Sequence, residues 1–279
     1  MDRERDTQAF VGVGMAEAGT PGMSPTEGGT PAAAPSPAPG REGGQGAGER
    51  AKLPGRAALL AAAGVVAGLA LSVIGSTIAV LAAPGNKLAL MLLSLGGLWT
   101  GLLGAVWTAS RKFGSGNVWR DFGVRLPASD IGRGLVVAVV GRVAGLILVV
   151  PLISISRRFI GSDLKPFEGA RTDPVLLAVV AALVLVGAPF VEELFFRGLL
   201  LRSLLPLLGP RGAIAAQALV FASLHLRPSY GLGNVSLVLA IGTMGIVQGI
   251  VAERYRRLGP VMVAHSLFNL PGLLAIATR

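Results

Sequence analysis

The chain contains no cysteine, only two histidines, and few charged residues for its length of 279: Lys, Arg, Asp and Glu together make up 14%. The missing thiols exclude a disulfide framework, a cysteine nucleophile and a thiolate metal site. Any chemistry must therefore use carboxylates, imidazoles or hydroxyls. Such a small charged fraction also cannot cover the surface of a soluble protein of this size.

Apolar residues are what the chain has in excess: they form 52% of the sequence, and the mean hydropathy is +0.66. This composition predicts a protein that crosses a membrane several times, with the lipid bilayer as its surroundings. The formal net charge of +10 does not indicate nucleic-acid binding, because the Lys and Arg residues lie in short loops between apolar runs. We expect no nucleic-acid partner.

The predicted fold class is all-α: a polytopic membrane helical bundle of about seven transmembrane helices. A membrane-spanning helix needs about 20 mainly apolar residues. The fifth candidate is the shortest and is expected to be tilted, broken or partly inserted. The seven segments are 57–83, 88–110, 134–156, 174–200, 212–227, 233–252 and 259–278.

Residues 1–52 are predicted to form a disordered cytoplasmic tail, because they are rich in Gly, Pro and Ala and lack hydrophobic periodicity. Residues 53–279 are predicted to form the transmembrane domain. In this orientation twelve Lys and Arg residues of the loops lie inside and seven outside, which favours a cytoplasmic amino terminus. The inside set is Lys52, Arg56, Arg111, Lys112, Arg120, Arg125, Arg133, Arg202, Arg211, Arg254, Arg256 and Arg257, and the outside set is Lys87, Arg157, Arg158, Lys165, Arg171, Arg227 and Arg279.

Two basic features of the third span and the loop before it have more than one interpretation. The segment 111–133 is either an interfacial stretch with its aromatic residues at headgroup level or an ordinary basic loop. Arg142, inside the third apolar run, is expected to snorkel or to mark a displaced span boundary rather than to act in catalysis.

Two adjacent carboxylates, Glu192 and Glu193, end the charge-free apolar run 174–191 and are followed by Arg197. Ionisable groups within a membrane are costly and usually mark function. On a helix Glu193 and Arg197 are separated by roughly 40°, whereas Glu192 and Arg197 are roughly 140° apart. Glu193 is therefore the predicted ion-pair partner, and Glu192 remains available to bind and activate water.

Both histidines fall in later apolar stretches, each with a companion four residues away: Phe221 before His225, and Asn269 after His265. Hydrolysis needs a group that activates water, a group that moves the leaving-group proton, and donors to the developing oxyanion. Glu192 with His225 suits the first two tasks, and His265 with Asn269 suits the third. Phe221 is expected to wall the pocket or pack on the imidazole.

These motifs resemble those of the CPBP family of intramembrane proteases, which includes the type II CAAX prenyl endopeptidases and the bacteriocin-processing or Abi proteins. The matching patterns are Glu-Glu-x-x-x-Arg at 192–197, Phe-x-x-x-His at 221–225 and His-x-x-x-Asn at 265–269. The resemblance covers about residues 115–279. It implies an all-helical protease of the bacterial plasma membrane whose site lies within the bilayer and opens to the cytoplasm.

The resemblance also implies roles for the site residues. The first Glu and first His of the family activate water, and the second His and the Asn stabilise the oxyanion; these roles fall on Glu192, His225, His265 and Asn269. Glu193 and Arg197 are implied to support the site, and Phe196 and Phe221 are expected at the substrate pocket. The implied substrate is a membrane-associated or lipidated peptide or protein, as in CAAX-type processing, bacteriocin maturation or self-immunity.

A zinc enzyme is the alternative mechanism, with His225, His265 and Glu192 as ligands. Glutamate chemistry without a metal or other cofactor is favoured, because no His-Glu-x-x-His pair lies on one helix and Arg197 would repel a cation. Two other functions also fit the polar residues: a proton- or ion-coupled transporter, and a non-catalytic membrane scaffold.

Overall fold

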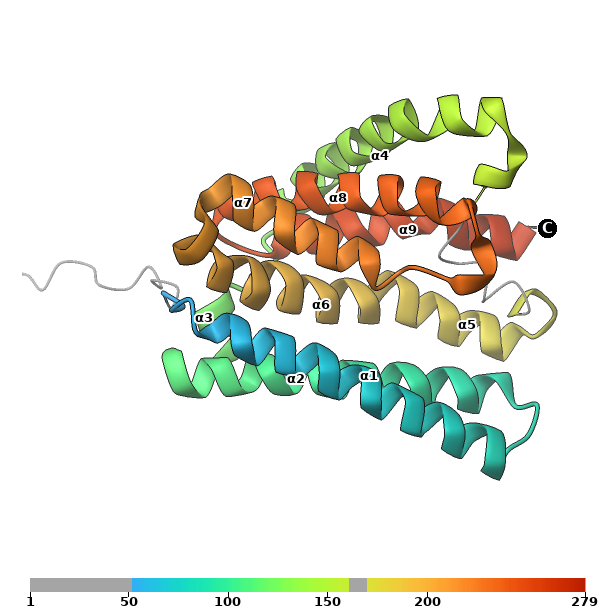
Figure 1. The fold of residues 1–279 in the computed structure, drawn as a ribbon, viewed down its shortest axis with the longest axis horizontal. Coiled ribbons are helices and arrows are strands. Elements are labelled where there is room, and N and C mark those ends of the chain that lie inside the picture. The colour runs from blue at the N-terminus through green and yellow to red at the C-terminus, as the bar shows by residue number, and fades with distance from the viewer. Residues whose placement is uncertain (1–51, 161–169, 279) are drawn as a thin grey trace, which may run out of the picture. The chain divides into compact units, whose positions relative to one another are not determined.

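The computed structural model describes residues 52–160 and 170–278. The predicted tail therefore lies outside the described residues, apart from Lys52. In the described ranges every regular element is helical, and Figure 1 shows the long helices lying side by side. The all-α bundle is thus confirmed.

Six of the described helical stretches are long and apolar enough to cross a membrane, which makes the chain an integral membrane protein. Four are α1 (Ala57–Ala82), α2 (Lys87–Phe113), α4 (Ser129–Ile155) and α8 (Gly233–Tyr255), and the others are α9 (Gly259–Thr278) and the 50-residue stretch Pro174–Ser223. That stretch comprises α5 (Pro174–Ala182), η3 (Leu183–Gly187), α6 (Ala188–Glu193), η4 (Leu194–Leu200) and α7 (Leu201–Ser223).

The long stretch folds back on itself inside α7. Gly209 there adopts φ 66° and ψ 174°, which is not helical, and it lies between Pro206 and Pro210. Proline cannot continue the helical hydrogen bonds, and glycine accepts a positive φ without strain. After this point the chain runs back beside α6 (Figure 1). The stretch therefore contains both of the segments predicted at 174–200 and 212–227.

Small residues let α1 and α2 pack closely along their length. A Cβ on Gly101 would lie 2.4 Å from the Cα of Gly68, so the two backbones touch at this crossing. Close backbone approach at small residues is the usual way for membrane helices to associate, because lipid provides no hydrophobic force between them. The opposite surfaces carry exposed apolar side chains such as Leu59 and Leu81. These surfaces suit contact with lipid.

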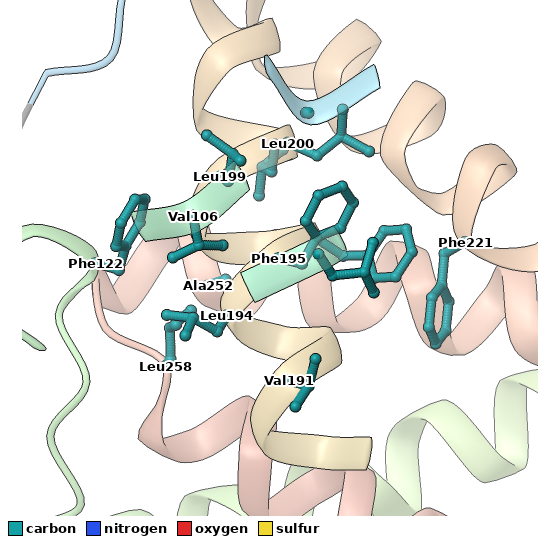
Figure 2. Close-up of a cluster of buried hydrophobic side chains, with 14 of the residues drawn as sticks. Val106, Phe122, Val191, Leu194, Phe195, Leu199, Leu200, Phe221, Ala252 and Leu258 are labelled. Carbon is teal, nitrogen blue, oxygen red and sulfur yellow. The ribbon is translucent and has the colours of Figure 1, made fainter. Parts of the chain in front are cut away.

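A central cluster of buried apolar side chains surrounds the segment that carries the two glutamates (Figure 2). Val191, Leu194 and Phe195 from that segment lie in it, and Phe221 joins them from α7. All seven residues of η4 are buried. The core of the molecule is thus built around the polar site.

Arg142 lies in the middle of α4. Its Nη2 donates a hydrogen bond to the carbonyl of Phe268, and its guanidinium lies 4.2 Å from the Phe268 ring centroid. This contact joins α4 to α9 immediately before Asn269. The charge of Arg142 thus has its partner on another helix.

The basic segment 111–133 contains a short helix, α3 (Val118–Phe122). Trp119 is exposed, but Phe122 is fully buried in the central cluster. The aromatic residues of this segment therefore do not all lie at headgroup level. Asp121, also buried, accepts hydrogen bonds from the Ser110 and Ser115 hydroxyls and from the Ser115 N–H, which fix α3 to the end of α2.

Asp121 makes the stability of this end of the bundle depend on pH. Burial raises the pKa of Asp121, but hydrogen bonds from Ser110, Ser115 and Gly116 outweigh burial and hold the pKa below its ordinary 3.8. A lowered folded-state pKa stabilises the protein above the unfolded-state value, and the stabilisation is lost as the pH falls through the folded-state value. We expect Asp121→Asn to lower the thermal unfolding midpoint at pH 7 and the deficit to shrink below pH ~3.8. Thermal unfolding of the wild type and the variant in detergent, at pH 7 and below pH ~3.8, checks this. A difference between their unfolding midpoints that does not change with pH would contradict it.

Candidate active site

A proline organises the helix that presents the glutamates. Pro189 has no N–H, so it cannot bond to a carbonyl in the preceding turn. The chain widens into the π-helical turn η3, in which the Ala188 N–H bonds to the carbonyl of Leu183. The carbonyls of Val184 and Leu185 are then left for partners elsewhere, because residue 189 would be their partner in a π- or α-helix respectively.

Helix α9 supplies those partners. The Asn269 amide donates from Nδ2 to the Val184 carbonyl at 3.0 Å, and the Ser266 hydroxyl donates to the Leu185 carbonyl at 2.7 Å. Buried carbonyls of this kind are costly unless they are bonded. The two bonds therefore dock α9 beside the glutamates, and Asn269 keeps a second amide hydrogen for another acceptor.

Glu193, Arg197 and His265 form a connected buried group. Arg197 Nη1 donates to Glu193 Oε1 at 2.8 Å, and His265 Nδ1 lies 2.7 Å from the same oxygen. Both members of the ion pair are fully buried. The predicted pairing of Glu193 with Arg197 is thus confirmed, and the structure adds His265 as the second partner of that carboxylate.

Aromatic rings extend this group towards the other histidine. The Arg197 guanidinium lies 4.5 Å from the Phe221 ring centroid. The same ring also packs edge-on against His225, with a centroid distance of 4.9 Å. Phe196 also packs edge-on against Phe221 at 4.9 Å. The prediction that Phe221 packs on the imidazole is confirmed.

His225 lies just beyond the end of α7, not inside a helix as the apolar run predicted. The helix ends at Ser223, where the amides of Leu224 and His225 turn to the carbonyls of Val220 and Ala222. His225 still contacts the residue four positions before it, because its Nδ1 lies 2.8 Å from the Phe221 carbonyl oxygen. A carbonyl only accepts hydrogen bonds, so Nδ1 carries the proton.

A cavity of about 150 Å³ brings the predicted residues together. This is room for a few water molecules. Its polar lining comes from Glu192, His225, Arg227, His265 and Asn269, and its apolar lining from Leu95, Leu98, Trp99, Leu102, Leu183, Val184, Ala188, Phe196 and Leu224. Glu193, Arg197 and Phe221 are not part of the lining and contact it only through their neighbours.

The hydrogen bonds of the two imidazole rings determine which nitrogen of each ring remains available to the cavity. In both histidines Nδ1 donates, to Glu193 in one case and to Phe221 in the other. A neutral ring held in this way has an unprotonated Nε2 that accepts hydrogen bonds. His265 Nε2 lies 3.9 Å from Glu192 Oε2, so a water to one side of this pair is within hydrogen-bond distance of both atoms. For His265 to donate to an oxyanion, its ring must carry a second proton.

Several residues of the site were not specified by any of the sequence motifs. Trp99 of α2 packs on Gly187, where a Cβ would lie 2.5 Å from the indole Cη2. Pro189 and Ser266 position Asn269 and the glutamates through the orphaned carbonyls. Pro189, three residues before Glu192, was the signal available, because a proline within a membrane helix frees carbonyls that a neighbouring polar side chain must bind.

The donor set does not fit the zinc alternative. No group of three or more His, Cys, Asp or Glu side chains among the described residues is arranged to hold a metal ion. His265 Nε2 and Glu192 Oε2 are within reach of one ion, but the third predicted ligand, His225, does not complete such a group. We therefore derive no step through zinc.

Comparison with protein families addresses the same region. Residues 174–271 match the family model described as type II CAAX prenyl endopeptidase Rce1-like. This segment is Rce1-like. The match includes every residue of the three motifs, so the family resemblance is confirmed for residues 174–271 of the predicted 115–279, and the family is one of CAAX-type intramembrane proteases. No match was found among curated proteins or among solved structures.

The Rce1-like segment begins at α5 and ends within α9, so it does not contain the whole cavity. Leu95, Leu98, Trp99 and Leu102 come from α2, before the match begins. The polar half of the cavity thus belongs to the Rce1-like segment, and α2 adds one apolar wall. Side chains on α2 are therefore in place to contact whatever enters the cavity.

The two α9 bonds to η3 provide a test of what Asn269 does. Asn269 and Ser266 each bind one orphaned carbonyl, but only Asn269 lines the cavity. We expect Asn269→Ala to lower the rate of peptide cleavage by about 10²-fold or more, as for loss of an oxyanion donor. Ser266→Ala should lower it by less than about tenfold at a similar loss of thermal stability, since a single docking bond contributes about 1 kcal/mol. Equal rate losses in the two variants would mean that Asn269 only docks the helix.

Proposed function

We propose that the protein is an intramembrane endopeptidase that hydrolyses a peptide bond in a membrane-associated or lipidated peptide or protein, with Glu192 as the base that activates water. The observation that carries this is the single small cavity lined by Glu192, both histidines and Asn269. Polar and ionisable groups that converge in an otherwise apolar cavity are what water-activating sites require.

In this mechanism a water molecule lies between Glu192 and the Nε2 atoms of the histidines. Glu192 takes a proton from the water as its oxygen attacks the carbonyl carbon of the substrate. The free N–H of Asn269 and the Nε2–H of His265, whose ring must already hold both protons when the substrate binds, then stabilise the negative oxygen of the tetrahedral intermediate. His225 is the second group that carries the proton taken from water, and it delivers this proton to the departing nitrogen. The peptide C–N bond then breaks.

Glu193 and Arg197 act behind the cavity in this proposal. The carboxylate of Glu193 fixes the ring of His265 through Nδ1, and the guanidinium of Arg197 neutralises that carboxylate. They are positioning residues and do not touch the substrate.

The proposal includes no metal or other cofactor, because Glu192 and the histidines account for each proton movement. The amino terminus is proposed to lie in the cytoplasm, on the strength of the basic loops. A lipidated substrate fits the apolar wall that α2 adds to the cavity, where a hydrocarbon chain avoids water.

Comparison of protein termini in membranes tests the function directly. Membranes from cells that make the wild type should contain at least one new amino or carboxy terminus that is absent when Glu192→Gln is made instead. Addition of a zinc chelator to the wild-type membranes should not remove it. Ion-dependent flux in liposomes without any cleavage would favour a transporter, and a normal phenotype of Glu192→Gln with a co-purified partner would favour a scaffold.

A further inference from the structure

Trp99 is a tryptophan in the middle of a membrane helix. Twelve residues of α2 precede it and 14 follow it, so about 18 Å of helix or more separates it from either end. Tryptophan in membrane proteins is enriched near the membrane surface, where the ring lies in an apolar layer and the N–H bonds to water or headgroups. In the middle of a span, the indole N–H must find its acceptor inside the protein or on a ligand.

The protein offers no acceptor for this N–H among the described residues. Nε1 of Trp99 is buried and makes no hydrogen bond within residues 52–160 and 170–278. The neighbouring polar side chains of α2 differ, because the Ser94 and Thr100 hydroxyls bond to carbonyls of their own helix. An enclosed N–H without an acceptor destabilises a folded protein. Folding stability therefore does not account for this nitrogen.

The position of Trp99 connects the N–H with the catalytic cavity. Among the α2 residues that line the cavity, Trp99 alone has a polar side-chain atom, since the others are leucines. Its six-membered ring rests on η3, where a Cβ on Gly187 would lie 2.5 Å from Cη2 and 2.9 Å from Cζ3. The carbonyls that Pro189 frees in η3 are bound by Asn269 and Ser266 instead of by the indole. A ligand that enters the cavity can bring the acceptor that η3 does not offer.

We propose that the Trp99 indole N–H donates a hydrogen bond to a backbone carbonyl of the bound peptide, about two residues from the bond that is cleaved. This rests on the proposed function. Gly187, which holds the ring, lies five residues before Glu192, and five helical residues rise by about 7.5 Å. An extended peptide advances by about 3.3 Å per residue, so the same distance corresponds to two residues of substrate. Because the acceptor is a backbone carbonyl, the contact selects an extended peptide and not a particular side chain.

The test replaces the indole of Trp99 by its sulfur analogue in the full-length protein. Trp99→benzothienylalanine, introduced by stop-codon suppression, nearly keeps the shape of the ring and removes the N–H. On a quenched fluorescent peptide that ends in S-farnesyl-cysteine followed by Val-Ile-Met, kcat/KM should fall about tenfold, mainly through KM, as for one hydrogen bond to bound substrate. The thermal unfolding midpoint without peptide should stay the same or rise, since an unbonded N–H is removed. A lower midpoint with unchanged cleavage would give Trp99 a structural role and overturn the proposal.

Trp107 provides the matched control on the same helix. It is 55% exposed and does not line the cavity, so the same replacement there should leave kcat/KM unchanged. Peptides with one backbone ester in place of an amide locate the acceptor, because an ester carbonyl accepts hydrogen bonds more weakly. At one position, about two residues from the cleaved bond, the ester should lower kcat/KM more in the wild type than in the Trp99 variant. Equal ester effects in the two proteins at every position would overturn the contact.

The indole signals in nuclear magnetic resonance test the contact without turnover. The chain has three tryptophans, so isotope-labelled Glu192→Gln should give three indole N–H signals. The signal that disappears in Glu192→Gln/Trp99→Phe belongs to Trp99. Addition of the peptide should move this proton signal to higher frequency, as formation of a hydrogen bond does. A signal that does not move would reject the contact.

Failure of this proposal is distinguishable from failure of the proposed function. If the wild type and Trp99→benzothienylalanine cleave the peptide equally while Glu192→Gln does not cleave it, the protease assignment stands and the Trp99 contact is rejected. If no variant cleaves the peptide but the Trp99 signal moves when the peptide is added, the contact stands and the proposed function fails.

Discussion

Glu192→Gln is expected to abolish peptide cleavage, with kcat lowered by about 10³-fold or more. Glutamine has nearly the shape of glutamate but cannot take a proton from water. The Glu192 side chain lines the cavity, is 17% exposed and has, among the described residues, no hydrogen bond or ion pair shorter than the 3.9 Å to His265 Nε2, so the substitution breaks no short bond there. The thermal unfolding midpoint should therefore stay close to that of the wild type.

The matched control is Glu253→Gln, the same chemical change in α8 at a residue that does not line the cavity. It should retain wild-type cleavage. Rates on a quenched peptide and unfolding midpoints of all three proteins in the same detergent make the comparison. Substantial cleavage by Glu192→Gln would remove the general base from the mechanism and with it the main argument for the site.

Arg197→Met is expected to destabilise the protein by about 3–5 kcal/mol, because it leaves a buried carboxylate without its cation. Both side chains of the Arg197–Glu193 pair are fully buried, and the guanidinium also lies against the Phe221 ring. Loss of the pair should disturb the His265 contact with Glu193 and thus lower cleavage as well. Arg197→Lys should recover only part of the stability, since lysine lacks the planar group that stacks on the ring.

An ion pair whose cation is exposed gives the control for this prediction. Arg133 pairs with Asp130 at 3.1 Å, but its side chain is 39% exposed and Arg257 also binds Asp130. Arg133→Met should cost less than about 1 kcal/mol, as is usual for surface pairs. In the double variant Glu193→Gln/Arg197→Met the buried charge is gone, and stability should be partly restored relative to Arg197→Met. A double variant as unstable as the single one would show that packing, not charge, holds this position.

Much of the site was predictable because membrane burial makes polar residues stand out. Glu192, His225, His265 and Asn269 lie in long apolar runs, where an ionisable or amide side chain is costly. Their convergence on one cavity follows that expectation. The spacing of Glu193 and Arg197 predicted their ion pair from helix geometry alone, because side chains four residues apart share a face.

Other features depended on contacts between segments that no local pattern records. The turn at His225 follows the end of α7, although the apolar run continues to Leu226. Glu193 binds His265 as well as Arg197, a contact between residues 72 positions apart. Trp99 enters the cavity from a helix outside the matched segment, and nothing in its neighbourhood marks it as a site residue.

The sequence by itself determined that this chain is a bundle of membrane helices and which few polar groups lie inside that bundle. The reason is that unbonded backbone groups and charged side chains are costly in hydrocarbon, so the chain must be helical there and its rare polar residues stand out. Only the tertiary structure decided how those groups divide their work. Pro189 leaves two carbonyls without partners, and the docking of α9 onto them places Asn269. The Nδ1 bonds of the two rings then settle which nitrogen each turns to the cavity, since a histidine's proton is fixed by the neighbour it meets in three dimensions.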